Sequence, residues 1–180
     1  MQSLSKFVEE QMATRPLNEM LDEVLSKYDG VPVTKDNIED IYESVARVVN
    51  SNRARRGSQF ERTIQSYLVN AFKDKGIFVY SQVPVKASNA KIDFVVSKED
   101  TSKDKLNLLD AVIVSCKVSL RERWRVDQHL YNQCKQYYLV TMDEKLPHES
   151  MPANVHFVST KITSQSDSLC ASILDALGAN

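Results

Sequence analysis

Two charged residues, Asp93 and Lys117, lie within apolar stretches of the sequence that we expect to form neighbouring strands. Asp93 is followed by Phe-Val-Val, and Lys117 ends the run Val-Ile-Val-Ser-Cys-Lys. A buried strand does not readily accept an isolated charge, so we expect the two side chains to converge at one edge of a sheet. There, a carboxylate beside an ammonium can hold Mg²⁺ and a polarised water, and the lysine can orient or deprotonate that water while the metal neutralises a phosphate. A structural ion pair at a strand end accounts for the same two residues equally well.

An arginine-rich block follows Lys117. Arg121, Arg123 and Arg125 lie within five residues, together with Glu122 and the only tryptophan of the chain, Trp124. The fork of donors on arginine matches guanine O6 and N7, and a glutamate can accept a hydrogen bond from cytosine N4. The alternative is an exposed helix start with charge pairs one turn apart, although arginine near a helix N-terminus opposes the helix dipole. The block therefore indicates that bases are read beside a site that acts on the nucleic-acid backbone.

The formal net charge of −1 conceals a strong asymmetry along the chain. Residues 1–44 contain four basic and ten acidic side chains, a net charge of −6, so the remainder carries +5. A second basic cluster in the remainder has a net charge of +3; its members are Arg53, Arg55, Arg56 and Arg62 against Glu61. Such clusters contact phosphates and supply affinity without sequence information, which favours a nucleic-acid partner. The alternative for the acidic segment 1–44 is a charged helix exposed to solvent. The alternative for the basic cluster is the exposed N-terminus of a helix.

The length and composition favour one globular domain, or one domain with a helical extension. No apolar run approaches the roughly 20 residues that cross a bilayer, and the first ten residues lack the apolar core of a secretion signal. The three cysteines are widely spaced and form no CxxC pair, which argues against a disulfide framework and against a zinc site. We therefore expect a protein of the reducing, cytoplasmic compartment.

Hydrophobic periodicity predicts helices first and a sheet afterwards. Helical spacing covers 4–12 and 17–25, a third helix begins at Thr34, and a fourth begins at Ser58 and ends at Gly76. The expected strands are 77–85, 91–96, 108–117, 136–142 and 155–158, and the expected later helices are 121–133 and 168–177. This order predicts an α/β fold, with a mixed β-sheet flanked by helices and an N-terminal helical segment.

The chain resembles a known family at these residues. Asp93 on one strand and Ser115-Cys116-Lys117 on the next look like the PD-(D/E)XK nuclease signature. The continuation Lys117-Val-Ser-Leu-Arg-Glu-Arg-Trp-Arg125 is similar to the Lys-Thr-(Ser/Thr)-x-Arg-(Glu/Asp)-Arg-Trp block of type II restriction endonucleases of the EcoRII and PspGI kind. The nuclease-core resemblance covers about residues 55–142, and the block 115–125 is its specific part. Residues 1–50 match the family by no motif.

The resemblance implies roles for individual residues. Asp93 would be the metal-binding carboxylate, Lys117 the catalytic lysine, and the backbone carbonyl of Cys116 a second metal ligand. Arg121 and Glu122 match the base-reading positions of the family. Arg123 and Arg125 lie in the same block, and the cluster at Arg53, Arg55 and Arg56 would contact phosphates.

Ser115 departs from the signature, which has an acid two residues before the lysine. In the resembling enzymes a carboxylate from the following helix takes its place, but Leu130 stands at the expected spacing here. Asp127, about one helical turn earlier, is our candidate for the displaced acid. Glu61 is the other candidate, because family members often contribute a glutamate from the helix before the strands. Ser58 to Glu61 also matches a capping box, in which Glu61 would bond back to the Ser58 amide, and the two interpretations of Glu61 stay open.

The resemblance predicts a Mg²⁺-dependent type II restriction endonuclease that cuts both strands of DNA at a specific site. One small chain has one site, so a homodimer with twofold symmetry is the simplest arrangement. We expect residues 1–50 to serve dimerisation or to embrace the DNA, and residues 51–180 to form the nuclease core. Two alternatives remain: a small subunit of a heterodimeric nuclease or a nicking or repair nuclease, and a non-catalytic DNA-binding module that kept the fold.

Overall fold

The computed structural model describes residues 2–12, 16–85, 90–120, 123–145 and 151–179. Its centre is a five-stranded sheet in the order β1-β2-β3-β4-β5, formed by the strands Phe78–Pro84, Lys91–Ser97, Val112–Lys117, Gln136–Thr141 and Val155–Ser159. The first two pairings are antiparallel, and β3-β4 and β4-β5 are parallel. The predicted mixed sheet is therefore confirmed, with strand limits within a few residues of those expected except at β3, where Leu108–Asp110 forms a short 3₁₀ turn (η2) instead of strand.

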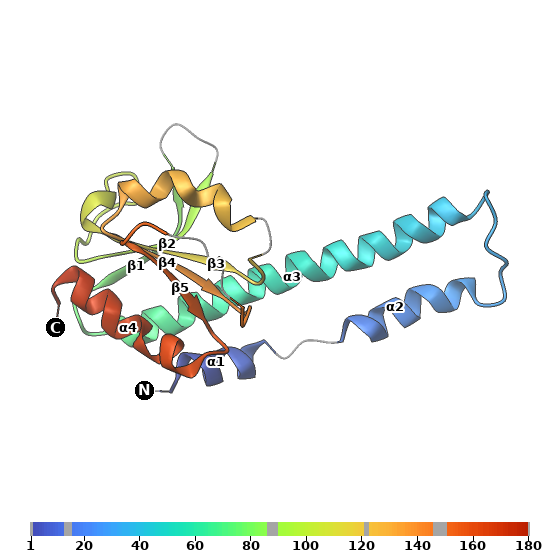
Figure 1. The fold of residues 1–180 in the computed structure, drawn as a ribbon, viewed down its shortest axis with the longest axis horizontal. Helices are drawn as coiled ribbons and strands as arrows, with labels where there is room; N and C mark the ends of the chain where they lie inside the picture. Colours follow the sequence, from blue (N-terminus) through green and yellow to red (C-terminus); the bar gives the residue numbers. More distant parts are fainter. Residues whose placement is uncertain (1, 13–15, 86–89, 121–122, 146–150, 180) are drawn as a thin grey trace.

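Helices cover both faces of the sheet (Figure 1). On one face, α1 (Leu4–Gln11), α4 (Thr163–Leu177) and the C-terminal half of α3 (Ile38–Phe72) pack against alternate residues of the strands, including Phe94, Val96 and Val114. On the other face, η3 (Arg123–Gln133) packs Leu130 and Tyr131 against the opposite set of strand side chains. The result is three layers with a hydrophobic core on each side of the sheet, the arrangement predicted for an α/β fold.

The third and fourth helices predicted from the sequence are one continuous helix. α3 runs for 35 residues, and Gly57 and Ser58 lie inside it. The prediction of a helix start at Ser58 was wrong because a single glycine costs a helix only about 1 kcal/mol, and the alanine and arginines before it favour helix. The division expected near residue 50 falls inside α3, and α1 packs on the body of the protein against α3 and α4.

The N-terminal half of α3 leaves the body and pairs with α2 (Leu17–Leu25), and a short 3₁₀ turn, η1 (Ser26–Tyr28), follows α2 (Figure 1). We call residues 17–52 the hairpin and the rest of the described chain the body. The Tyr28 hydroxyl lies 3.0 Å from Ser44 Oγ, and Arg55 Nη2 donates to Met20 Sδ at 3.4 Å. No residue of α2 is buried. Large apolar side chains are exposed around the hairpin tip; they are Leu25, Val31, Val33, Ile38 and Tyr42.

α4 begins at Thr163, five residues before the predicted start, because its first turn is polar and carries no hydrophobic stripe. Leu169, Ile173 and Leu177 form its buried face. It ends at Gly178, whose φ of 61° is the left-handed conformation that glycine adopts without strain. Within the described residues, the search for a helix with the length and apolar character of a membrane span finds none.

Candidate active site

Asp93 and Lys117 meet where the β2-β3 ladder opens. The paired residues of these strands run from Val96 with Val112 to Phe94 with Val114. Beyond that point the Asp93 carboxylate takes the place of a backbone partner: its Oδ2 accepts from the Cys116 amide at 2.8 Å and from Ser115 Oγ at 3.1 Å. Lys117 Nζ lies 3.7 Å from the same oxygen. The two charges converge at one edge of the sheet, as the strand positions predicted.

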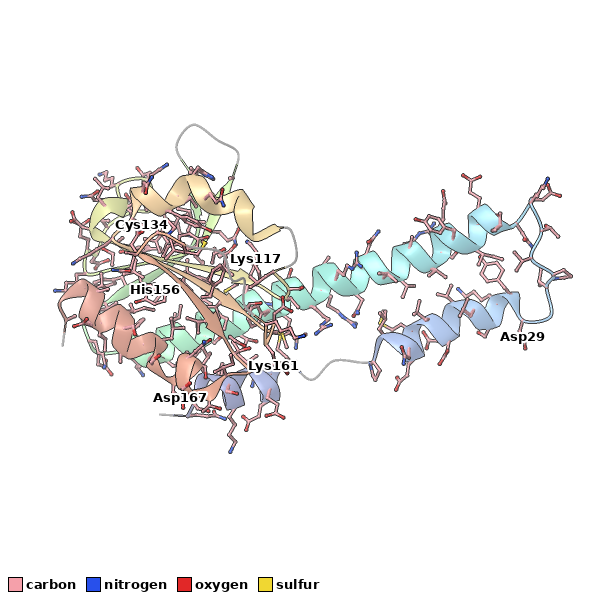
Figure 2. All side chains as sticks on the ribbon, viewed as in Figure 1. Asp29, Lys117, Cys134, His156, Lys161 and Asp167 are labelled. Carbon is pink, nitrogen blue, oxygen red and sulfur yellow. The ribbon has the colours of Figure 1, made fainter. Side chains whose placement is uncertain are left out.

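The ion pair is accessible without being fully solvated. The side chain of Asp93 is 13% exposed and that of Lys117 is 26% exposed. Figure 2 shows Lys117 at the end of the sheet from which α3 projects, well away from Asp29 at the hairpin tip. A partly desolvated carboxylate with three donors around one oxygen is held in a fixed position, which is what a metal-binding or water-orienting group requires.

Glu61 joins the two residues from α3. Its pKa is raised, mainly because burial disfavours the charged carboxylate and secondly because Asp93 repels it, while Lys117 acts in the opposite direction. The charges of Asp93 and Lys117 therefore both act on Glu61, and Gln82 of β1, which lies opposite Asp93, contacts the Glu61 carboxylate. The capping-box interpretation is wrong, because Ser58 lies within α3 and no helix begins there.

Gln82 is a residue of this site that the sequence did not reveal. It lies opposite Asp93 between the paired positions Ser81–Phe94 and Val83–Ile92, and it has a φ of 54°. Its Nε2 approaches Glu61 Oε2 at 3.4 Å. A left-handed backbone at a non-glycine residue in a strand is uncommon and tends to mark a functional position, but the residue type alone carries no such signal.

A small pocket lies beside the ion pair, and it includes Leu130, which stands where the resemblance led us to expect an additional acid. Its lining includes Asp93, Ser115, Lys117 and Leu130. Leu130 is 3% exposed and belongs to the core on the η3 side of the sheet. The spacing argument therefore identified a position that does reach the site, but the side chain there is apolar.

The donors at this site suit a hard cation. Asp93 and Glu61 supply carboxylate oxygens, and magnesium accepts few protein oxygens while keeping several waters. The Cys116 side chain is buried, and its pKa is raised well above the ordinary value, mainly by burial. In the described part of the chain, no group of three or more His, Cys, Asp or Glu side chains is arranged to hold a metal ion.

The side chains of the predicted base-reading block lie outside the described residues. Arg121 and Glu122 lie outside the described residues, and the side chains of Arg123, Arg125 and Asp127, in η3, are likewise outside the description.

The arginines of the second basic cluster lie on different sides of α3 and have different surroundings. Arg53 is exposed, Arg55 donates to Asn52 Oδ1 and to Met20 Sδ, and Arg56 is half-buried. On a helical wheel Arg53 lies two turns before Glu61, within about a quarter-turn of its direction. Arg53 and Arg55 are both exposed, but Arg55 also contacts Met20 of α2.

Comparison with known proteins gives a family and a fold. The family model described as EcoRII C terminal matches residues 17–162. The structure is similar to that of metal-depleted Ecl18kI in complex with uncleaved, modified DNA (TM-score 0.59, 21% identity, 95% of this chain and 59% of that one). It is also similar to metal-depleted Ecl18kI in complex with uncleaved DNA (TM-score 0.54, 20% identity, 90% of this chain and 62% of that one). The chain thus spans about three-fifths of the length of these relatives. No curated protein matches it.

Proposed function

We propose, from the premise that this chain belongs to the EcoRII C-terminal family, that it is a Mg²⁺-dependent type II restriction endonuclease of the cytoplasm. It would make site-specific double-strand cuts in DNA by hydrolysing a phosphodiester. The similarity to the EcoRII-like enzymes inferred from residues 115–125 is confirmed by the match over 17–162, and the fold by the likeness to Ecl18kI. Cleavage, the metal and the oligomeric state are our proposals.

The observation that carries the proposal is the convergence of Asp93, Lys117 and Glu61 at one edge of the sheet. The three side chains come from three separate elements, β2, β3 and α3. Core packing does not require two carboxylates and an ammonium at one point, and mutual repulsion of the carboxylates has a cost in stability. Such an arrangement is typical of a site that performs chemistry.

In the proposed mechanism Asp93 and the backbone carbonyl of Cys116 would hold Mg²⁺, and Glu61 would supply a further carboxylate. When bound, the metal would neutralise charge on the phosphate and lower the pKa of a coordinated water. Ser115 and the Cys116 amide keep the Asp93 carboxylate in one orientation. Ser115 therefore serves as a positioning group in place of the acid of the signature, and Asp127 remains the proposed additional acid.

Lys117 would orient the attacking water or, as the neutral amine, accept its proton. Its Nζ lies 3.7 Å from Asp93 Oδ2, which directs the side chain toward the site. Lys117 also limits the repulsion between Asp93 and Glu61. Its positive charge lowers the pKa of Glu61, whereas burial and the charge of Asp93 raise it.

DNA contacts are proposed for two groups of residues. Arg121, Glu122, Arg123 and Arg125 would contact base edges, because they follow the catalytic lysine within eight positions. Arg53, Arg55 and Arg56 would contact phosphates, with Arg53 the best placed of the three. A homodimer on double-stranded DNA would bring two such sites to the two strands. Within residues 1–50, the exposed apolar tip of the hairpin is the proposed dimer contact.

One observation favours a second candidate function. Leu130 and Ser115 occupy the two positions where related sites carry acids, and both line the pocket beside Lys117. A site with fewer acids binds a metal less tightly, so the chain could be a DNA-binding module that kept the fold without cleavage. The small subunit of a heterodimeric or nicking nuclease is a further form of the enzymatic hypothesis.

The test is incubation of the purified protein with DNA of varied sequence and Mg²⁺, beside Asp93→Ala and Lys117→Ala. Discrete double-strand fragments are expected from the wild type, and the variants should be slower by about 10²–10³-fold or more, as when one electrostatic group is removed from an active site. Lys105→Ala, which changes an exposed lysine before β3, is the matched control and should cleave normally.

Each alternative has its own outcome. Specific DNA binding with no cleavage at any Mg²⁺ concentration would establish the non-catalytic module. Cuts in one strand alone would indicate a nicking enzyme or a missing partner subunit. If neither cleavage nor specific binding occurs on any sequence, the nuclease proposal is wrong.

A further inference from the structure

Asp143, just past the end of β4, binds the chain that leaves the catalytic strand. Its Oδ2 accepts from the Leu120 amide at 2.6 Å and from Ser119 Oγ at 3.1 Å. The Asp143 amide in turn donates to Thr141 Oγ1 at 3.1 Å. These contacts are possible because β3 and β4 are parallel and in register, with Lys117 opposite Thr141, so that both chains leave the sheet at the same edge.

The bonded segment lies between two functional regions. Lys117 is two residues before Ser119, and η3 begins at Arg123, three residues after Leu120. Leu120 is itself 3% exposed, so its side chain and its amide are both held by the body. The far end of η3 is fixed separately: Tyr131 is buried and its carbonyl accepts from Asn154 Nδ2 at 2.7 Å.

Asp143 is suited to this task by its charge as well as its position. A hydrogen bond from a backbone amide to a carboxylate is stronger than one between neutral groups. Two donors on one carboxylate oxygen fix both the main chain at Leu120 and the side chain at Ser119. Neither contact belongs to the β3-β4 ladder, which ends at Lys117 and Thr141, so the strands alone do not determine the direction of the chain after Lys117.

We infer that Asp143 is a positioning residue that sets the direction in which the chain leaves Lys117. It thereby couples the catalytic lysine to the arginine block that we propose reads bases. The inference rests on the proposed function for its biological meaning, although the geometric role of Asp143 is independent of it. Asp143 touches neither the substrate nor the metal.

Three variants test the inference. Asp143→Ala removes both hydrogen bonds, whereas Asp143→Asn keeps an oxygen that can accept them. Glu144→Ala is the matched control, because this neighbouring carboxylate is 69% exposed and pairs with Lys161 Nζ at 3.2 Å on the surface. The first measurement needs no DNA: it is the rate of hydrogen exchange at the Leu120 amide, which donates to Asp143. Exchange should be faster in Asp143→Ala and stay near the wild-type rate in Asp143→Asn and Glu144→Ala.

The second measurement is the ratio of cleavage at the preferred site to cleavage at a site with one base pair changed. Asp143→Ala should lower this ratio by about tenfold or more, since displacements near 1 Å at an active site can cost 10²-fold in rate. Asp143→Asn should restore most of the ratio. The melting temperature and the salt-dependent binding of unrelated DNA should change little in any variant, which separates positioning from general loss of stability.

The two measurements distinguish the failure of the inference from the failure of the proposed function. Unchanged exchange of the Leu120 amide in Asp143→Ala would overturn the inference, whatever the protein does to DNA. Faster exchange in a protein that neither cuts nor binds DNA specifically would retain the geometric role of Asp143 and reject the nuclease. Faster exchange with an unchanged cleavage ratio would reject the coupling to base reading.

Discussion

The body and the hairpin are joined by a single helix and yet differ in almost every physical respect. In the body, α3 buries a stripe that includes Phe60, Ile64 and Leu68, and the sheet is covered on both faces. In the hairpin, the apolar side chains of α2 are at most half-buried, and the tip exposes apolar side chains such as Val33 and Tyr42. Burial of apolar surface is the main stabilising contribution to folding, so the body supplies the stability and the hairpin depends on it. The same secondary structure therefore has two roles along one helix: it supports the core and it presents a surface.

The largest expected effect tests this division of stability. Phe60→Ala should lower the free energy of unfolding by about 3–5 kcal/mol, because Phe60 is fully buried and its removal leaves a cavity. Val33→Ala at the hairpin tip should change it by less than about 0.5 kcal/mol, since the side chain is 67% exposed. Denaturant unfolding of both variants measures the difference. Similar losses would mean that the hairpin tip is buried in the folded protein, for example in a dimer.

A second prediction concerns Gly57, which lies within α3 five residues after the end of the hairpin. A Cβ atom added there meets nothing within 4 Å, so Gly57→Ala should stabilise the protein by about 0.5–1 kcal/mol. Gly57→Pro should cost about 3 kcal/mol or more, because it removes a backbone hydrogen bond and interrupts α3. Thermal melting followed by circular dichroism measures both.

Gly76→Ala is the matched comparison for Gly57→Ala. Gly76 has a φ of 65°, so the same change should destabilise there, by about 1 kcal/mol. A loss of stability in Gly57→Ala would contradict a continuous helix at Gly57.

The smallest expected effect compares a half-buried carboxylate of the body, Glu61, with an exposed carboxylate of the hairpin, Glu43. The pKa of Glu61 is raised above its ordinary value of 4.5, chiefly by burial. The folded protein therefore binds more protons than the unfolded chain from about that pH upward, and stability falls as the pH rises through this window. Glu61→Gln should accordingly raise the melting temperature at neutral pH and leave it nearly unchanged at pH values below the window.

Glu43→Gln, at an exposed position of α3 in the hairpin, is the control and should alter neither value. Cleavage should fall in Glu61→Gln, so that stability and activity change in opposite directions. A lower melting temperature at neutral pH in this variant would show that the Glu61 carboxylate is structural.

The pairing of Asp93 with Lys117 could be predicted because strand positions and isolated charges are both visible in a sequence. The role of Glu61 could not be decided, because a serine three residues before a glutamate matches a capping box whether or not a helix begins there. The continuity of α3 excludes the capping box, and the catalytic role of Glu61 stays a prediction. Leu130, which stands at the spacing where the resemblance led us to expect an acid, does line the pocket beside Asp93 and Lys117.

Other parts of the site depend on contacts that no local pattern encodes. The left-handed backbone of Gln82 arises where the strand pairing is interrupted opposite Asp93, and glutamine gives no sign of it. Asp143 acquires its partners through the register of two parallel strands separated by η3, which periodicity does not specify. Such residues are recognised only once the sheet is assembled.

The continuity of α3 makes the protein a lever. From Ile38 at the tip to Glu61 at the active site the helix rises by about 35 Å, with no loop between them to absorb a displacement. The hairpin can therefore change its direction relative to the body only if α3 bends, because the C-terminal half of the same helix is packed in the core.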